Sequence, residues 1–136
     1  MLDWWRMIWL ARAVSAERRF FHLNDLLLRL RSGGFDYRVL DELYYTVPQD
    51  LWSSIIAMDW LPTKQWLRDL YDCDNFAFHF KTRIETRWKL NAVGCVFAPG
   101  HAFNVVVLPD MSLAYLEPQN GLWIEPQLDA SALVLI

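Results

Sequence analysis

Apolar residues between positions 73 and 88 recur at the spacing of one face of an α-helix, whereas most charged residues of this stretch fall elsewhere. The pattern predicts an amphipathic helix of about four turns. Asp72 precedes it as a suitable N-cap. The apolar face consists of Cys73, Ala77, Phe80, Ile84 and Trp88.

Downstream of this helix, short apolar runs alternate with turn residues, a pattern typical of strands. Gly100 separates the first run from the second, and a turn at 109–112 separates the second from the third. The predicted strands are 92–99, 101–108, 113–119, 122–124 and an edge strand at 133–136.

The first sixty residues favour helices instead. A helix capped by Ser15 is expected to run to Arg31 and to end at Ser32-Gly33-Gly34. Shorter helices are predicted at 35–45, 49–60 and 64–70. No internal repeat or low-complexity linker is present, so we expect one domain, 1–136, with a helical, aromatic-rich part (1–60) and a core (61–136). Helices packed on a small antiparallel sheet define an α+β fold.

Composition narrows the classes of partner. The chain has 136 residues, 54% of them hydrophobic, and eight tryptophans, which is ample material for one core. Its formal net charge is −3, and the basic residues are scattered. Nucleic acid is therefore not an expected partner. Nothing in the sequence indicates the oligomeric state.

The stretch 1–14 contains Trp4, Trp5 and Trp9 together with Arg6 and Arg12. It is too short and too charged to cross a bilayer, and it lacks the features of a signal peptide. Two interpretations remain, a helix lying on a membrane surface or a helix packed on the body of the protein. The modest cationic charge favours packing.

Two cysteines are present, and they do not form a metal-type Cys-x-x-Cys pair. We expect a reduced, cytoplasmic protein. Cys95 lies in an apolar run and is predicted to be a buried core thiol. Cys73 differs, because backbone N–H groups and the helix dipole at a helix start favour a thiolate. Asp72 and Asp74 oppose that effect, so a nearby cation would be needed.

His101 could supply that cation. It follows a glycine at a strand start, and Glu117 lies on the next strand. A histidine in this place can accept the thiol proton while a carboxylate fixes its tautomer. The residues thus predict Cys73 as nucleophile, His101 as general base and Glu117 as orienting acid.

Hairpin register decides whether this triad is possible. A two-residue turn at 110–111 would place Asn104 opposite Glu117 and turn the glutamate away from His101. An odd-length loop or a bulge would place His101, Phe103 and Glu117 on one face. In the other register, Gln119 or Asn104 would have to orient the histidine.

Three motifs carry a resemblance to a known family: Asp-Cys-Asp-Asn-Phe-Ala (72–77), Gly-His-Ala-Phe-Asn (100–104) and Leu-Glu-Pro-Gln (116–119). They resemble the signatures of papain-like and transglutaminase-like cysteine proteases. Within that superfamily they are most similar to the protease domain of fungal mushroom-agglutinin chimerolectins and its small bacterial and phage relatives. The resemblance extends from Leu61 to the end. Papain itself has a longer segment between Cys and His and uses Asn as third member.

The resemblance implies a papain-like fold and a thiol hydrolase built on the same three residues, whose chemistry requires no cofactor. It also implies Gln65 as an oxyanion donor, with Asn104 and Gln119 as further polar support. Agglutinin-type proteases are calcium-activated, so a Ca²⁺ site is possible. Its ligands would be Asp74, Gln119 and Asn120.

Three functional classes follow. The first is a cysteine peptidase or related thiol hydrolase acting on a peptide or protein substrate. The second is another acyl-transfer enzyme, either transglutaminase-like or a cell-wall peptide hydrolase. The third is a non-catalytic binding or assembly module of the same fold. The first two predict an alkylation-sensitive Cys73, and the third predicts an unreactive one.

Overall fold

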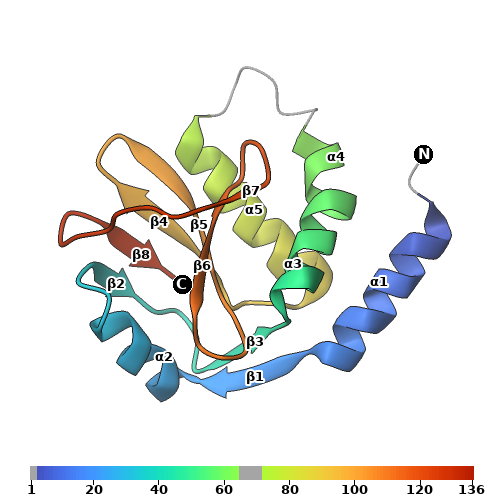
Figure 1. The fold of residues 1–136 in the computed structure, drawn as a ribbon, viewed down its shortest axis with the longest axis horizontal. Coiled ribbons are helices and arrows are strands. Elements are labelled where there is room, and N and C mark those ends of the chain that lie inside the picture. The colour runs from blue at the N-terminus through green and yellow to red at the C-terminus, as the bar shows by residue number, and fades with distance from the viewer. Residues whose placement is uncertain (1–2, 65–71) are drawn as a thin grey trace.

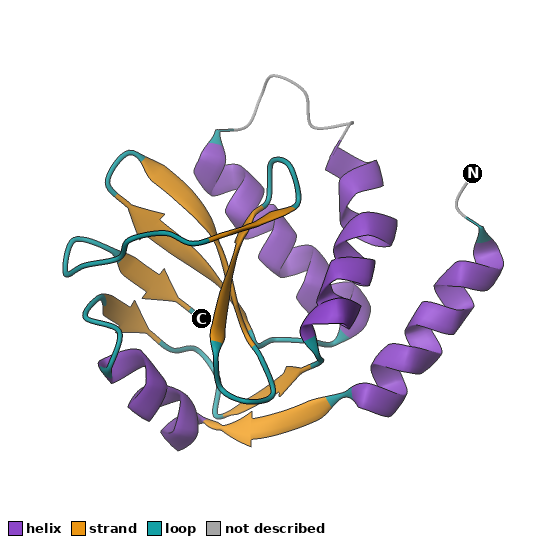
Figure 2. Cartoon of the chain, in the orientation of Figure 1, coloured by secondary structure: helices purple, strands orange, loops and turns teal. Residues whose placement is uncertain are grey.

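The computed structural model describes residues 3–64 and 72–136 (Figure 1). Helices and strands are interleaved along the chain, and both classes contribute to the body of the molecule (Figure 2). Within the described ranges, no helix is both long enough and apolar enough to span a membrane.

A six-stranded sheet in the order β2-β8-β4-β5-β6-β7 forms the centre of the fold. All neighbours are antiparallel except β2 and β8, which are parallel. Five of the strands confirm the strands predicted downstream of position 90. The six are β2 (Asp36–Arg38), β8 (Leu133–Leu135), β4 (Val93–Ala98), β5 (His101–Val107), β6 (Leu113–Glu117) and β7 (Leu122–Ile124).

Helix α5 (Cys73–Trp88) packs along β4 and β5, as its apolar face predicts. Phe80 and Ile84 of this helix share a buried cluster with Val93, Val106 and Leu116 of the sheet. A second cluster lies on the other face of the sheet, where α2 (Leu23–Arg31) contributes two buried leucines. Burial on both faces fixes the strand register, because a slip of one residue would exchange the faces.

The first sixty residues are less helical than predicted. Helix α1 (Trp4–Glu17) continues through Ser15, and the chain then extends as β1 (Arg19–His22) before α2 begins. Strand β1 pairs with β3 (Leu43–Thr46) in a separate two-stranded sheet. The predicted helix at 35–45 is wrong, since this stretch contains β2 and the start of β3.

Cross-strand aromatic packing explains this error. Phe21 of β1 stacks on Tyr44 of β3, with ring centroids 5.5 Å apart and planes 9° apart. The Tyr44 hydroxyl also donates to the backbone carbonyl of Ile136, 3.2 Å away. These partners lie 23 and 92 positions from Tyr44, so a local periodicity cannot reveal them.

Helical structure resumes after β3 without a break at the predicted boundary of 60/61. Helix α3 (Gln49–Ile55), the π-helical turn η1 (Ile56–Trp60) and α4 (Leu61–Lys64) follow one another directly. Trp52 and Trp60 are fully buried in the cluster below α5. The Trp60 indole donates to the carbonyl of Pro118 over 2.7 Å, which ties this helical run to the segment after β6.

Candidate functional site

Cys73 is the first residue of α5 and is half-buried. Its side chain packs against a small cluster of buried residues, Ala77 of α5, Cys95 of β4 and Ala102 of β5. Asp72 occupies the N-cap with extended backbone, as predicted, but its side chain makes no capping hydrogen bond. Instead, a hydrogen bond with Asp74 raises the pKa of Asp72 and lowers the pKa of Asp74.

His101 and Glu117 lie in direct contact. Nε2 of His101 is 2.6 Å from Oε2 of Glu117, and the carboxylate is the more buried partner. The loop between Val107 and Leu113, which pair with each other, has five residues. This odd length gives the register in which His101, Phe103 and Glu117 share a face, as the sequence required for their contact.

Cys73 and His101 have different nearest neighbours in the sheet, although those neighbours, Ala102 and Phe103, are adjacent on β5. Ala102, beside which Cys73 packs, belongs to the cluster under α5, whereas Phe103 belongs to the cluster under α2. The His101 ring lies 5.7 Å from that of Phe103. Among the residues described, Cys73 makes no hydrogen bond to His101 or Glu117. The structure therefore joins two members of the predicted triad and leaves the thiol outside their hydrogen bond.

Of the residues predicted as polar support, Asn104 and Gln119 make hydrogen bonds in different parts of the structure. Asn104 is fully buried, and its amide nitrogen donates to the carbonyls of Ala77 (2.9 Å) and Gly94 (3.0 Å). Its role is to tie α5 to the sheet. The backbone N–H of Gln119 donates to Oε1 of Glu117 over 3.0 Å and so helps to hold this carboxylate. Gln65 lies outside the described residues.

The predicted calcium ligands are used locally. Oδ1 of Asp74 accepts the N–H of Asn75, and Oδ1 of Asn120 accepts the N–H of Leu122, each over 3.0 Å. In the described part of the chain, no three His, Cys, Asp or Glu side chains are clustered so that they could hold a metal ion. Calcium also accepts amide and backbone oxygens, so the site at Asp74, Gln119 and Asn120 stays a prediction.

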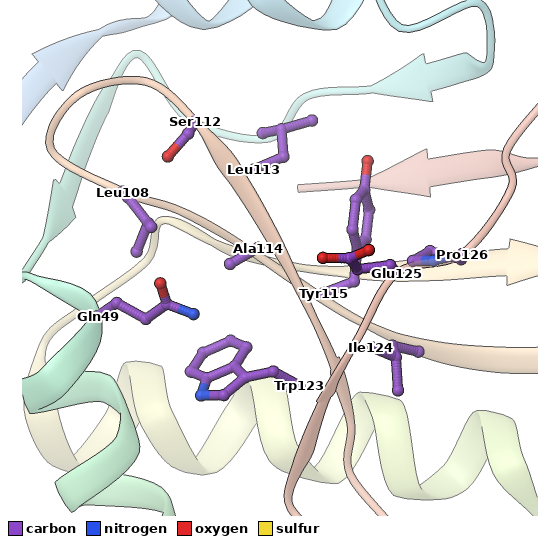
Figure 3. A pocket seen from close by; sticks show the side chains of 10 residues that line it. All are labelled: Gln49, Leu108, Ser112, Leu113, Ala114, Tyr115, Trp123, Ile124, Glu125 and Pro126. Atoms are coloured by element: carbon purple, nitrogen blue, oxygen red, sulfur yellow. The ribbon is translucent and has the colours of Figure 1, made fainter.

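A separate pocket of about 390 Å³ opens beside β6 and β7 (Figure 3). Trp123 and Tyr115 supply aromatic surface, and Gln49, Ser112 and Glu125 supply polar groups. The indole N–H of Trp123 donates to Oγ of Ser53 over 3.0 Å, which fixes the ring. Burial raises the pKa of the Tyr115 hydroxyl, which stays protonated at neutral pH. The remaining lining residues are Leu108, Leu113, Ala114, Ile124 and Pro126.

Sequence reasoning did not find this pocket. The run 122–124 predicted a strand around Trp123, but Gln49 is more than sixty positions away. Only the packing of α3 beside the β6–β7 edge brings Gln49 to the same opening, as Figure 3 shows. A tryptophan followed two positions later by a carboxylate, as in Trp123-Ile124-Glu125, was the one available signal.

The geometry defines an α+β domain with an aromatic pocket at one sheet edge and a His–Glu pair that joins β5 to β6. The chain belongs to the ricin-type beta-trefoil lectin C-terminal domain family, whose profile matches residues 23–136. No curated protein matched the chain in a search of whole sequences.

Two solved structures show a similar fold. One is a PSL1a-E64 complex, with a TM-score of 0.69 and 23% identity over 86% of this chain and 51% of that chain. The other is Polyporus squamosus lectin bound to the human-type influenza-binding epitope Neu5Aca2-6Galb1-4GlcNAc, with a TM-score of 0.67 and 23% identity over 86% and 49%. The chain thus spans about half the length of each.

These findings correct the sequence-based assignment. The matched family and the Polyporus neighbour are described as lectins, which contradicts the predicted papain-like protease family, its papain-like fold and the assignment as a cysteine hydrolase. Of the three functional classes, the non-catalytic binding module is the one they support. A peptide or protein substrate receives no support.

The family name describes a lectin, whereas the domain described here combines helices with a six-stranded sheet. The predicted triad rests only on the order and spacing of a cysteine, a histidine and an acidic residue along the chain. That pattern cannot specify a reaction, because the same side chains also serve packing and ligand binding.

Proposed function

We propose that this domain is a carbohydrate-binding module and that its saccharide site is the pocket between β6, β7 and α3. Two findings together support this proposal: the chain matches a lectin family, and the residues lining the pocket suit a saccharide. The epitope bound by the Polyporus lectin makes a saccharide the first ligand class to test.

The pocket offers the groups that a sugar ring needs. Trp123 provides flat apolar surface for the C–H face of a pyranose, whereas the Tyr115 ring lines the pocket from the other face of the sheet. The Tyr115 hydroxyl, the Gln49 amide and the Glu125 carboxylate provide donors and acceptors for ring hydroxyls. Because Ser53 holds the indole, the aromatic surface is ordered before binding, which lowers the entropic cost of association.

Calorimetric titration with galactose, N-acetylglucosamine and the trisaccharide Neu5Aca2-6Galb1-4GlcNAc tests this proposal. Tyr115→Phe and Glu125→Gln should each weaken binding about tenfold, the effect of one lost hydrogen bond to a ligand. Leu122→Ala is the matched control, since Leu122 is exposed on β7, the strand that carries Trp123, and does not line the pocket. Unchanged affinity in both pocket variants would disprove the location of the site.

We propose a second ligand site formed by Cys73, His101 and Glu117. Its support is the His101–Glu117 contact, the packing of Cys73 against Ala102, which follows His101 in the chain, and the E64 complex of a protein with a similar fold. E64 is therefore the probe. Thermal shift and intact mass would be measured with E64 on the wild type, Cys73→Ser and His101→Ala. Binding that requires Cys73 supports this site, and binding that survives both substitutions places E64 elsewhere.

A further inference from the structure

Helix α1 presents apolar side chains on two opposite faces. Leu10 and Val14 are buried against the body, where α1 contacts α3. The tryptophans are exposed to 64% (Trp4), 72% (Trp5) and 60% (Trp9), and Trp4 and Trp9 border hollows toward α5 and α3. Packing on the protein therefore accounts for only one face of this helix, and Figure 1 shows α1 at the margin of the molecule, beyond α3.

Three exposed indoles on one short helix are costly in water. Isolated exposed apolar residues are common, but a contiguous apolar patch usually marks an interaction surface. Tryptophan is also the side chain most suited to a membrane–water boundary, because its ring is apolar and its N–H is polar. The outer face thus has the composition of an interfacial helix.

The positive charge of the N-terminal segment indicates that α1 docks on a negatively charged surface. Residues 1–22 contain four arginines and two carboxylates, a formal charge of +2, whereas the whole chain carries −3. The remaining residues therefore carry −5. No carboxylate occurs between positions 4 and 16, and Arg6 and Arg12 are exposed within the helix. At 100° per residue, Arg12 projects between Ile8 and Trp5.

An apolar groove continues this surface toward α5. Its volume is about 330 Å³, and it is lined on the α1 side by Trp4, Met7, Ile8 and Ala11. Trp88 and Arg87 of α5 form the other wall. A groove with an apolar floor and an arginine at its edge suits a lipid acyl chain below an anionic headgroup.

We propose that the outer face of α1 docks this domain onto an anionic lipid surface, with the tryptophans at the level of the headgroups and the arginines on lipid phosphates and carboxylates. The helix lies on the membrane and does not cross it. The carboxylates Glu17 and Asp50, which border the hollow beside Trp9, limit the contact face on the α3 side. This activity is independent of the saccharide pocket, which lies beside β6 and β7.

Flotation of the purified protein with vesicles tests the proposal. The vesicles are pure phosphatidylcholine or phosphatidylcholine with about 30% phosphatidylserine. The wild type should float with the anionic vesicles, and binding should fall at least tenfold in Arg6→Glu/Arg12→Glu, in Trp5→Ser/Trp9→Ser and at high salt. Leu28→Ser is the matched control, because Leu28 is 69% exposed on α2 and should not change binding.

Each opposite result overturns the proposal. Equal binding to neutral vesicles would remove the role of charge, and wild-type binding by the tryptophan variant would remove the role of the outer face. Sedimentation velocity without vesicles tests a second copy of the chain as occupant: a dimer that dissociates in the tryptophan variant would replace the lipid surface. The substituted residues are exposed, so circular dichroism should confirm that the variants fold.

Discussion

Nε2 of His101, at the start of β5, lies 2.6 Å from Oε2 of Glu117, at the end of β6. The five-residue loop between these strands sets the register that brings the two side chains to one face. The histidine side chain is 41% exposed, whereas the glutamate is 14% exposed and also accepts the N–H of Gln119. The backbone therefore holds the carboxylate, and the carboxylate orients the imidazole.

This arrangement predicts a small coupling energy between the two residues. We expect His101→Ala and Glu117→Gln to be non-additive by about 0.2–1 kcal/mol in the free energy of unfolding, because solvent screens the exposed imidazole. Urea denaturation of the two single variants and the double variant measures this coupling. Strict additivity would show that the contact contributes nothing to stability.

The non-catalytic assignment predicts that the protein does not hydrolyse peptides. Wild type and Cys73→Ala should give the same background rate on denatured casein and on a mixed fluorogenic peptide library, with and without added calcium or chelator. The readout is product formation by fluorescence and mass spectrometry. Hydrolysis by the wild type that disappears in Cys73→Ala would contradict the assignment and restore Cys73 as a nucleophile.

Asp59 is the most consequential buried charge in the described core. It is 2% exposed, and its carboxylate accepts hydrogen bonds from Arg83 (2.8 Å) and from the indole N–H of Trp88 (2.9 Å), with Arg87 at 3.2 Å. We expect Asp59→Ala to lower the free energy of unfolding by about 3 kcal/mol, because it leaves these donors unpaired around a cavity.

Chemical denaturation checks this value, with Asp36→Asn as control. Asp36 forms an ion pair with Arg38 at 2.9 Å, but both side chains are more than half exposed. That substitution should change stability by less than about 0.5 kcal/mol. Equal effects of the two substitutions would mean that burial of the Asp59 network does not determine its contribution.

The sequence predicted the elements whose signals are local. The helix at 73–88 has five apolar residues at helical spacing, and the strands from 93 onward are bounded by glycine and proline turns. Both follow from side-chain periodicity and turn chemistry. The sequence also showed that a contact between His101 and Glu117 requires an odd-length hairpin loop, and the loop has five residues.

The elements and the pocket that the sequence could not predict depend on contacts between residues far apart in the chain. Strand β2 forms because β8, nearly a hundred positions later, offers a parallel edge, and β1 forms because β3 does. The pocket around Trp123 likewise needs Gln49 from α3. The function was misassigned for another reason: three side chains in a familiar order indicate a possible chemistry, whereas Cys73 lacks a hydrogen bond to the other two in the described structure.

Cys95 gives a prediction about pH. It is fully buried between α5 and the sheet, as the sequence predicted, and burial raises the pKa of its thiol from 9.0 to about 12. Between these values the unfolded chain loses the thiol proton while the folded protein keeps it. The unfolded state then binds fewer protons, so stability falls as pH rises above 9.

The loss should reach roughly 4 kcal/mol across the whole interval, at about 1.4 kcal/mol for each pH unit. Tyr44 and Tyr115, whose pKa values are also raised by burial, contribute in the same direction. The Cys95 contribution is therefore the difference between the wild type and Cys95→Ala, measured by urea denaturation from pH 8 to 11. Parallel stability curves for the two proteins would show that the thiol ionises equally in both states, which is incompatible with its burial.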